Sequence, residues 1–522
     1  MKPQPSIASS AKQSKVILVI GMIVIILSCQ KNNDSAYSTM TAPVEFSATI
    51  PVDINPALRK ELIASGDFFE LNEVYNFYSW QALIAINWPL GADGNALDNF
   101  TDNGTPSWLQ WKEAFQVYRS DGKQPAPWGS PRSDSGLDIK KAILSDTDAR
   151  IILSSNTPTH PTSRNIADET DQAFAGKLYD QNGNVVVYEV LMNKEEFDYV
   201  LENKLFNING QIEFSKTNTK ANFPEGNYEA QKLGATEIKL AWKILEDSDY
   251  KERYFSDEGY IINDTTGNPE KKNLGLIGFH ISQKTPTGKQ WVWSTFEHID
   301  NLDQNIIEVN GKRTLIHPTL TNPDCEICPV NIDNDNNTYT YHETAHGNYR
   351  KINNDSLKYY AESKQMKTQS KRMVDIPVRV DRVNKLMQAY FKDQGSVWQY
   401  YQLIDTQYPI DQNAQPATST ATEYYIPNSV VNKPGGKPNL AFLTNISMET
   451  FFQKGNQIAG LMENSQSDFT IFGTESCIGC HSSAYLIKSY VPAKDSLVLG
   501  TQLSGDFSWL LQKASWETGV VK

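Results

Sequence analysis

Two apolar runs near the middle of the chain decide its fold. The first reads Leu-Gly-Leu-Ile-Gly-Phe-His-Ile-Ser over residues 274–282, and the second reads Gln-Trp-Val-Trp-Ser-Thr-Phe-Glu-His over residues 290–298. Each run has the length of a strand, and the segment between them, Thr-Pro-Thr-Gly-Lys at 285–289, has the residues of a turn. The pattern predicts a β-hairpin of two apolar strands.

Helices and further strands are expected on both sides of this hairpin. Alternating polar and apolar residues favour a strand over 235–245, and Asn55 with Pro56 marks the start of a helix. Because strands and helices do not alternate as β-α-β units, we expect an α+β fold with a large mixed domain over residues 46–440 and a small, mostly helical segment over 441–522. Expected helices cover residues 56–63, 71–86, 107–118, 379–391, 398–403 and 507–513, and a strand at 185–188 precedes a further helix.

The composition is that of a globular, acidic protein. The 522 residues include 48 basic and 61 acidic side chains, for a formal net charge of −13. A negatively charged protein repels the phosphate backbone of nucleic acids, so no nucleic-acid partner is expected. A hydrophobic fraction of 39% excludes a multi-span membrane protein, and five cysteines exclude a disulfide scaffold.

The N-terminus has the pattern of an export signal. The apolar run Val16–Leu27 follows a leader that carries lysines and no acidic residue. It is shorter than the roughly 20 residues of a membrane-spanning helix and fits a signal peptide. Ser28 and Cys29 resemble the lipobox of bacterial lipoproteins, and an uncleaved anchor is the alternative. The lipoprotein interpretation predicts a signal peptide over 1–28, lipidation of Cys29, a tether over 29–45, and a protein facing the periplasm or the cell exterior.

The strongest chemical motif is C-x-x-C-H at Cys477–His481. Two thiols at this spacing add to the vinyl groups of a haem, and the following imidazole ligates the iron. The motif predicts one covalent haem c, held by Cys477 and Cys480, with His481 as axial ligand. A redox-active cysteine pair and one half of a zinc site are the alternatives.

If the haem iron has a second protein ligand, that ligand must come from the chain before the C-x-x-C-H motif. Residues 482–522 contain neither Met nor His. Glu297 stands beside His298 and would orient its imidazole towards a metal. A five-coordinate iron is the other alternative. The upstream candidates are His298, His280, Met448 and Met462.

A second cysteine pair is not a haem motif. Cys325 and Cys328 have the same spacing, but Pro329 stands where an axial histidine is required. We interpret the pair as a local disulfide in an exported loop, with free thiols or a metal site as alternatives.

A zinc-protease motif, H-E-x-x-H, occurs at 342–346. On a helix, His342 and His346 would bind zinc and Glu343 would act as general base. The flanking residues are polar and rich in turn formers, which favours an exposed loop instead.

A weak calcium pattern precedes that motif. Asp333, Asp335 and Asn337 resemble the start of an EF-hand loop, but Thr338 stands in the place of its glycine and Thr344 in the place of its last glutamate. A solvated turn fits these departures better than a calcium site.

Several blocks together resemble a family of uncharacterised exported bacterial proteins of the cytochrome c type. The resemblance covers residues from about 75 to 485 and implies a monohaem c-type protein without a known substrate. The blocks are Ser79–Pro89, Glu237–Lys243, Gly278–Ile281, Trp291–His298 with Asn301, Tyr401–Gln407, and Met448–Thr450 ahead of the C-x-x-C-H motif.

Three functions compete on this evidence. The first is a membrane-tethered c-type cytochrome that transfers single electrons to or from an unidentified redox protein. The second is a haem enzyme of peroxidase or oxidase type, with a pocket in the region before the motif. The third is the zinc protease. Electron transfer is preferred because no catalytic group is recognisable upstream.

Overall fold

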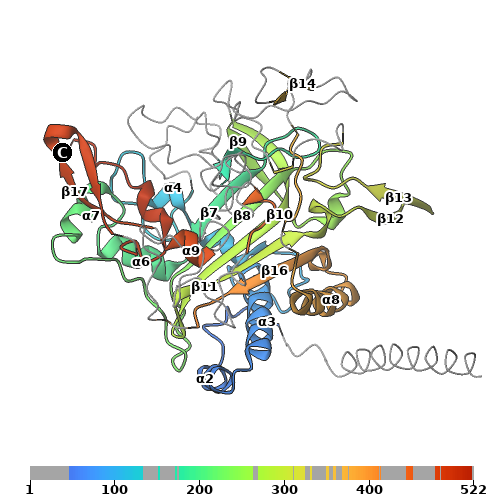
Figure 1. Ribbon diagram of the computed structural model, residues 1–522, viewed down its shortest axis with the longest axis horizontal. Helices are drawn as coiled ribbons and strands as arrows, with labels where there is room; N and C mark the ends of the chain where they lie inside the picture. The colour runs from blue at the N-terminus through green and yellow to red at the C-terminus, as the bar shows by residue number, and fades with distance from the viewer. Residues whose placement is uncertain are drawn as a thin grey trace, which may run out of the picture. The chain divides into compact units, whose positions relative to one another are not determined.

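The computed structural model describes residues 46–132, 151–152, 171–172, 176–262, 269–309, 311–323, 330–331, 349–351, 357–359, 367–373, 375–410, 412, 443–450, 477–482, 484–501 and 503–519 (Figure 1). Residues 46–522 cluster as one compact unit and residues 1–45 as another. The leader and Cys29 lie outside the described residues. None of the described helices is long and apolar enough to cross a bilayer.

An eight-stranded sheet forms the centre of the unit of residues 46–522. The strand order is β16-β11-β10-β8-β7-β3, and β9 pairs with both β10 and β4. Neighbouring strands are antiparallel, except that β4 and β9 are parallel. The strands are β3 Lys112–Glu113, β4 Ile151–Ile152, β7 Val187–Met192, β8 Thr236–Ile244, β9 Ser256–Ile262, β10 Pro269–Thr285, β11 Gly288–His298 and β16 Tyr401–Gln407.

The predicted hairpin is confirmed and lies in the middle of this sheet. Its strands are β10 and β11, in which Phe279 pairs with Phe296 and His280 pairs with Thr295. The strand predicted over 235–245 is β8, which pairs with the other edge of β10. The prediction of a mixed α+β fold is therefore confirmed.

Helices and smaller sheets surround the large sheet. Asn55 caps the first helix as predicted, because its side chain accepts hydrogen bonds from two backbone N–H groups of the first turn. The helices are α2 Pro56–Ser65, α3 Phe68–Ile86, α4 Ala114–Val117, α6 Lys194–Glu202, α7 Ile208–Phe214, α8 Val378–Asp393 and α9 Cys477–His481, with 3-10 helices η1 Ser107–Gln110, η2 Lys251–Arg253, η3 Ile299–Asn301, η4 Val397–Tyr400, η9 Pro492–Lys494 and η10 Trp509–Lys513. Two-stranded sheets pair β1 Pro89–Leu90 with β2 Thr105–Pro106, β5 Asp171–Gln172 with β6 Gly176–Lys177, β12 Asn305–Val309 with β13 Lys312–Ile316, β14 Tyr349–Lys351 with β15 Leu357–Tyr359, and β17 Ile487–Val491 with β18 Ser496–Leu499.

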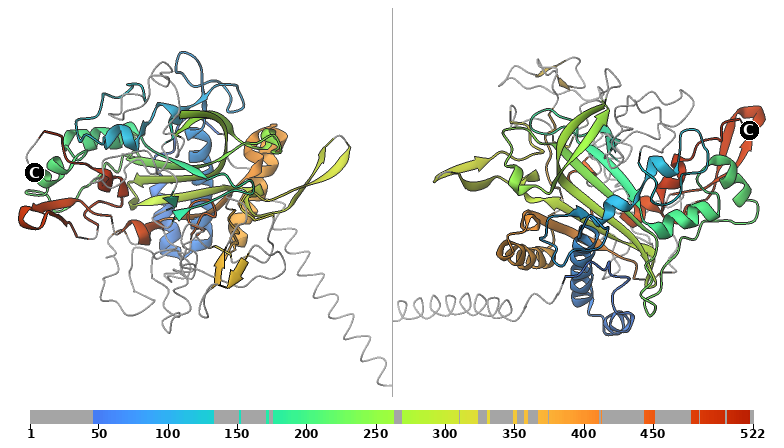
Figure 2. Two further views of the ribbon diagram at one scale, coloured as in Figure 1. Left: turned by 90° about the horizontal axis from the view of Figure 1, so that it is seen from above. Right: turned by 180° about the vertical axis from the view of Figure 1, so that it is seen from behind.

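One face of the sheet packs against helices α3 and α8 (Figures 1 and 2). Successive side chains of a strand point to opposite faces, so Leu240, Phe279 and Phe296 share this face. All three are fully buried. Trp80 of α3 contacts Phe296 with ring centroids 4.9 Å apart and Phe391 of α8 at 5.5 Å. This apolar layer fixes the two helices on the sheet.

The opposite face of the sheet, here called the motif face, carries polar and aromatic side chains. The C-x-x-C-H motif packs there, since Ile478 of α9 and Leu510 of η10 share one core with Trp291 and Trp293 of β11. Described residues on both sides of position 440 thus share one core. The residues of the motif face include Met192, Glu237, Lys239, His280, Ser282, Trp293 and Thr295.

Three predicted helices differ from the structure. The segment 107–118 is not one helix, because Lys112–Glu113 pairs with β7 and separates η1 from α4. The segment 398–403 becomes strand after Tyr400, because β16 completes the edge of the sheet beside β11. The segment 507–513 is a 3-10 helix that begins at Trp509, with Ser508 as its cap. Pairing with the sheet overrides helical periodicity in the first two cases.

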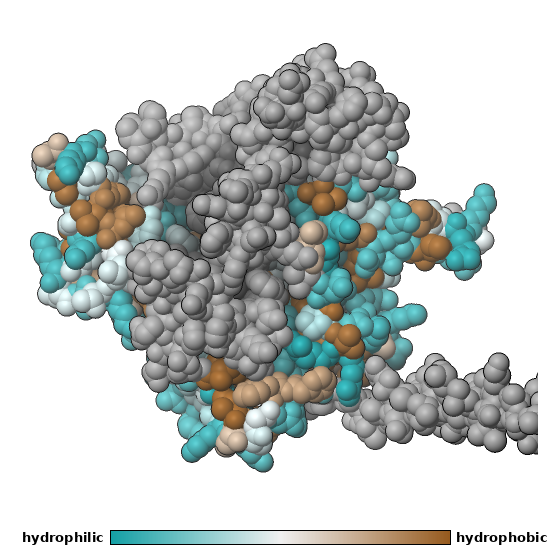
Figure 3. Space-filling model, viewed as in Figure 1, coloured by the Kyte–Doolittle hydropathy of each residue, from teal (hydrophilic) through white to brown (hydrophobic). Residues whose placement is uncertain are grey.

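The hairpin of β12 and β13 exposes apolar side chains outside the core. Ile306 and Leu315 are 54% and 55% exposed. Figure 3 shows these strands, at the right, with hydrophobic atoms beside a hydrophilic tip. Such a position offers a matched control for substitutions in the core.

We predict that Phe296→Ala destabilises the protein by about 3–5 kcal/mol, the usual cost of removing a buried aromatic ring. Phe296 is fully buried against Trp80, so its removal leaves a cavity between the sheet and α3. The free energy of unfolding in urea is the measurement. Leu315→Ala, at an exposed site, is the control and should change it by less than about 0.5 kcal/mol. Equal effects of the two substitutions would contradict this assignment of the core.

Candidate functional site

The C-x-x-C-H motif forms the short helix α9 against strand β11. Ile478 is fully buried, and its backbone N–H donates to Gln407 Oε1 of the edge strand β16 at 2.8 Å. The side chain of Cys477 is partly buried at the border of the same core. The apolar residue inside the motif therefore anchors the C-x-x-C-H helix to the sheet.

His481 is held in the orientation that a metal ligand needs. Its Nδ1 lies 2.7 Å from the carbonyl oxygen of Phe507. A carbonyl oxygen can only accept, so Nδ1 carries the proton and Nε2 keeps its lone pair. Among the described residues, no protein group bonds to Nε2. Metal-binding histidines characteristically donate their other ring N–H in this way.

Aromatic rings enclose the His481 side chain. The Trp293 ring lies 4.3 Å from it, tilted by 50°, and the Trp509 ring lies 6.5 Å away. Burial is the largest cause that lowers the pKa of His481, to about 4. The imidazole is therefore neutral at pH 7, as a metal ligand must be.

The carbonyl that orients His481 belongs to a strained turn. Leu503, Asp506 and Phe507 have φ angles of 66°, 50° and 70°, in the left-handed region that non-glycine residues avoid. Each such residue costs about 1–3 kcal/mol and persists only where its surroundings impose it. We call residues 503–508 the clasp turn. It also bonds to the chain just after the motif, since Leu503 N–H donates to Ser482 O at 2.8 Å.

A buried ion pair holds the clasp turn. Asp506 accepts from Lys284 Nζ at 2.6 Å and from the backbone N–H of Phe223 at 2.7 Å. Burial raises the pKa of Asp506, and the Lys284 charge opposes this shift. Lys284 lies at the end of β10, and Asn222 Oδ1 accepts from the same Nζ at 3.0 Å. The central strand of the sheet thus fixes the turn that orients His481.

A second polar cluster occupies the motif face beside β10. His280 Nε2 lies 3.4 Å from Glu449 Oε2, and the two side chains are 15% and 18% exposed. Burial alone would raise the pKa of Glu449, but His280 and Lys239 lower it below its usual value. The charges of His280, Glu449 and Lys239 also act on His481. The two clusters therefore belong to one electrostatic environment.

The segment that carries Glu449 is fixed on the sheet by its own hydrogen bonds. Asn445 donates from Nδ2 to Thr295 Oγ1 and to Phe296 O, both at 2.8 Å. A side chain at Gly278 would place its Cβ 2.0 Å from Ser447 Oγ, so the close approach of this segment requires glycine in β10.

The candidates for a second axial ligand have different surroundings. Both ring nitrogens of His298 are engaged, Nε2 with Arg253 O at 3.0 Å and Nδ1 with the N–H of Asp300 at 3.1 Å. Met448 is fully buried in an apolar cluster. His280 is the candidate whose charge acts on His481.

The expected role of Glu297 is wrong. Its carboxylate accepts from the backbone N–H of Ile446 and pairs with Arg372. Glu297 and His298 are consecutive in β11 and point to opposite faces of the sheet. Glu297 therefore fixes the 443–450 segment and does not orient an imidazole.

The remaining predicted sites belong to other parts of the chain. Cys325 with Cys328, the H-E-x-x-H motif at 342–346, the acidic run from Asp333, and Met462 all lie outside the described residues. Within the part of the chain that the structure describes, no group of three or more His, Cys, Asp or Glu side chains could hold a metal ion.

Two features near the motif escaped sequence reasoning. One is the clasp turn, which has no signature in local sequence. The other is a pair of buried carboxyl groups, Glu196 of α6 and Glu237 of β8. Burial raises the pKa of both, and Ser508 of the clasp turn bonds to Glu237. Helix α6 begins with Lys-Glu-Glu, which is typical of an exposed helix start. The sequence therefore does not indicate that the Glu196 side chain faces the core.

No family model matches the chain, and neither the search of curated proteins nor that of solved structures found a match. The assignment of this site therefore rests on its own geometry.

We predict that Glu196→Gln stabilises the protein increasingly as the pH rises. Burial and the neighbouring Glu237 raise the pKa of Glu196 well above 4.5, so its contribution to stability is present at low pH and is lost as the pH rises through the raised value. Glutamine keeps the shape and does not titrate. The free energy of unfolding of the variant minus that of wild type should increase between about pH 5 and about pH 8. Glu213→Gln, 71% exposed, is the control. A difference independent of pH would contradict the buried acid pair.

Proposed function

We propose that this chain is an exported, membrane-tethered c-type cytochrome that transfers single electrons. Cys477 and Cys480 would hold one covalent haem, and His481 would be its axial ligand. The observation that carries the proposal is the bond from His481 Nδ1–H to Phe507 O, which leaves Nε2 for the metal. The bound haem would supply a one-electron redox centre.

The residues present fit this cofactor. The described structure provides a neutral imidazole, a cysteine at the border of the core and two tryptophan rings around the histidine. Aromatic and aliphatic walls exclude water, which tunes the potential of a redox centre. The proposed lipidation of Cys29 and the tether over 29–45 would keep the protein at a membrane surface, where a redox partner can reach it.

The experiment that tests electron transfer is a spectroscopic redox titration of the mature protein. Electron transfer predicts a reversible transition of one electron and a low-spin spectrum in both oxidation states. Replacing both Cys477 and Cys480 with Ala should abolish covalent haem. An irreversible transition, or turnover of peroxide by wild type, would contradict a pure electron carrier.

The clasp turn gives a sharper prediction. Asp506→Asn should weaken the contact with Lys284, loosen the Phe507 carbonyl, and make the His481 imidazole less basic. A less basic ligand stabilises the ferric state less, so the reduction potential should rise while haem stays attached. Asp495→Asn, in another turn of positive φ, is the control and should leave the potential unchanged. Equal potentials in both variants and wild type would contradict the role of the turn.

The His280–Glu449 pair supports a second candidate, a haem enzyme. An imidazole beside a carboxylate can accept and return a proton, which is the acid–base function that peroxide chemistry requires. If His280 is instead the second axial ligand, it blocks that chemistry. Of the three candidates that lie among the described residues, the surroundings of His280 fit ligation best, because His298 is engaged in hydrogen bonds and Met448 is packed in an apolar cluster.

Carbon monoxide distinguishes these roles of His280. As a ligand, His280 should prevent carbon monoxide from binding to the reduced wild-type protein, and His280→Ala should bind it rapidly. His317→Ala is the matched control, because among the described residues the His317 ring bonds to Pro318 O in its own loop. Rapid binding by wild type would overturn ligation by His280 and favour the enzyme.

A further inference from the structure

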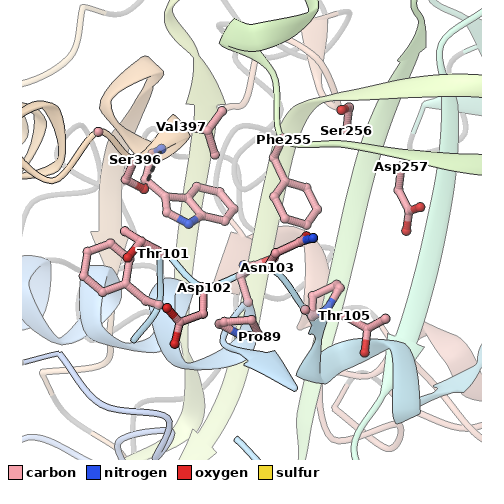
Figure 4. A pocket seen from close by; sticks show the side chains of 16 residues that line it. Pro89, Thr101, Asp102, Asn103, Thr105, Phe255, Ser256, Asp257, Ser396 and Val397 are labelled. Atoms are coloured by element: carbon pink, nitrogen blue, oxygen red, sulfur yellow. Dashed lines mark hydrogen bonds between the residues drawn. The ribbon is translucent and has the colours of Figure 1, made fainter. Parts of the chain in front are cut away.

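A pocket away from the motif helix lies between the β1–β2 connection, the start of β9 and the turn before η4. Its volume is about 430 Å³, within the range of about 300–1,000 Å³ that small-molecule sites occupy. In Figure 4, Thr101, Asp102 and Asn103 lie on one side, and Phe255, Ser256 and Val397 on the other. None of the elements that hold His481 contributes to it.

Aromatic rings form one wall of this pocket. Phe255 and Trp398 stack with centroids 5.2 Å apart and planes 19° apart. Trp398 is only 3% exposed, yet it lines the pocket. Its indole N–H has no partner among the described residues. A donor without a protein partner at a pocket wall is available to a ligand.

Polar side chains form the opposite wall. The side chains of Thr101, Asn103 and Thr105 make no hydrogen bonds with other described residues, and Asp102 uses one carboxylate oxygen to accept from Asn99 N–H at 2.9 Å. Hydroxyl and amide groups both donate and accept, while the free carboxylate oxygen only accepts. The wall therefore suits a ligand that carries both donors and acceptors.

The polar wall is pre-formed. Pro89 pairs with Pro106 and Leu90 with Thr105, which closes the connection at its base. A side chain at Gly104 would bring its Cβ to 2.5 Å from the carbonyl oxygen of Leu90, so the loop packs tightly on β1. A rigid wall reduces the entropy lost on binding.

We propose that this pocket binds a neutral, hydroxyl-rich ligand of the saccharide class. The apolar face of a sugar ring packs on aromatic side chains, and its hydroxyl groups meet the Thr, Asn and Asp side chains of the other wall. Asp102 repels anions. A quaternary ammonium ion could pack on the aromatic rings. It carries no hydrogen-bond acceptor, however, so it would leave the Trp398 N–H without a partner. This inference does not depend on the proposed haem.

The test is saturation-transfer NMR of the mature protein with glucose, N-acetylglucosamine, maltose and cellobiose. At least one sugar should bind, and Trp398→Phe, which removes the N–H donor but keeps an aromatic ring, should weaken binding about fivefold. Asn103→Ala, at an exposed rim position, should do the same without affecting folding. Asn218→Ala, exposed and outside the pocket, is the matched control and should bind as wild type.

Three results would overturn the proposal. The first is no saturation transfer to any of the four sugars. The second is equal binding by the Asn103→Ala and Asn218→Ala variants, which would place any bound sugar elsewhere. The third is binding of tetramethylammonium in place of the sugars, which would make the pocket a cation site. If Trp398→Phe does not fold, the Asn103→Ala comparison decides.

Discussion

The alternation of side chains along the β10–β11 hairpin governs the rest of the structure. Because neighbours in a strand point to opposite faces, Phe279 and Phe296 build the core under α3 and α8, while His280 and Trp293 face the motif. A register slip of one residue would exchange the two sets and bury the polar cluster. The same two strands thus support both the stability of the fold and the candidate site.

Strain concentrated in the clasp turn is the second constraint. Three non-glycine residues with positive φ stand within residues 503–508, next to a buried ion pair between Asp506 and Lys284. Breaking one partner of such a pair costs several kcal/mol, because the other charge stays buried. This cost keeps the strained turn closed on His481. Strain held by its surroundings at one carbonyl is typical of functional sites.

Local patterns allowed much of the fold to be predicted. The hairpin, β8, the cap at Asn55 and the helix α8 follow from periodicity and turn residues, which act over a few positions. The contacts between residues far apart in the chain could not be predicted from these local patterns. Asp506 pairs with Lys284 across 222 positions, and no local pattern indicates that pairing. His298 looked like a ligand in sequence, but its ring nitrogens bond to Arg253 and Asp300 in the fold.

The central claim is that Cys477–His481 carries one covalent haem. The most direct test is peptide mapping by mass spectrometry, after production of the full chain in cells that attach haem c. The account predicts one haem per chain, on the peptide that contains Cys477 and Cys480. A mature protein without covalent haem, or with haem on the peptide of Cys325 and Cys328, would contradict it.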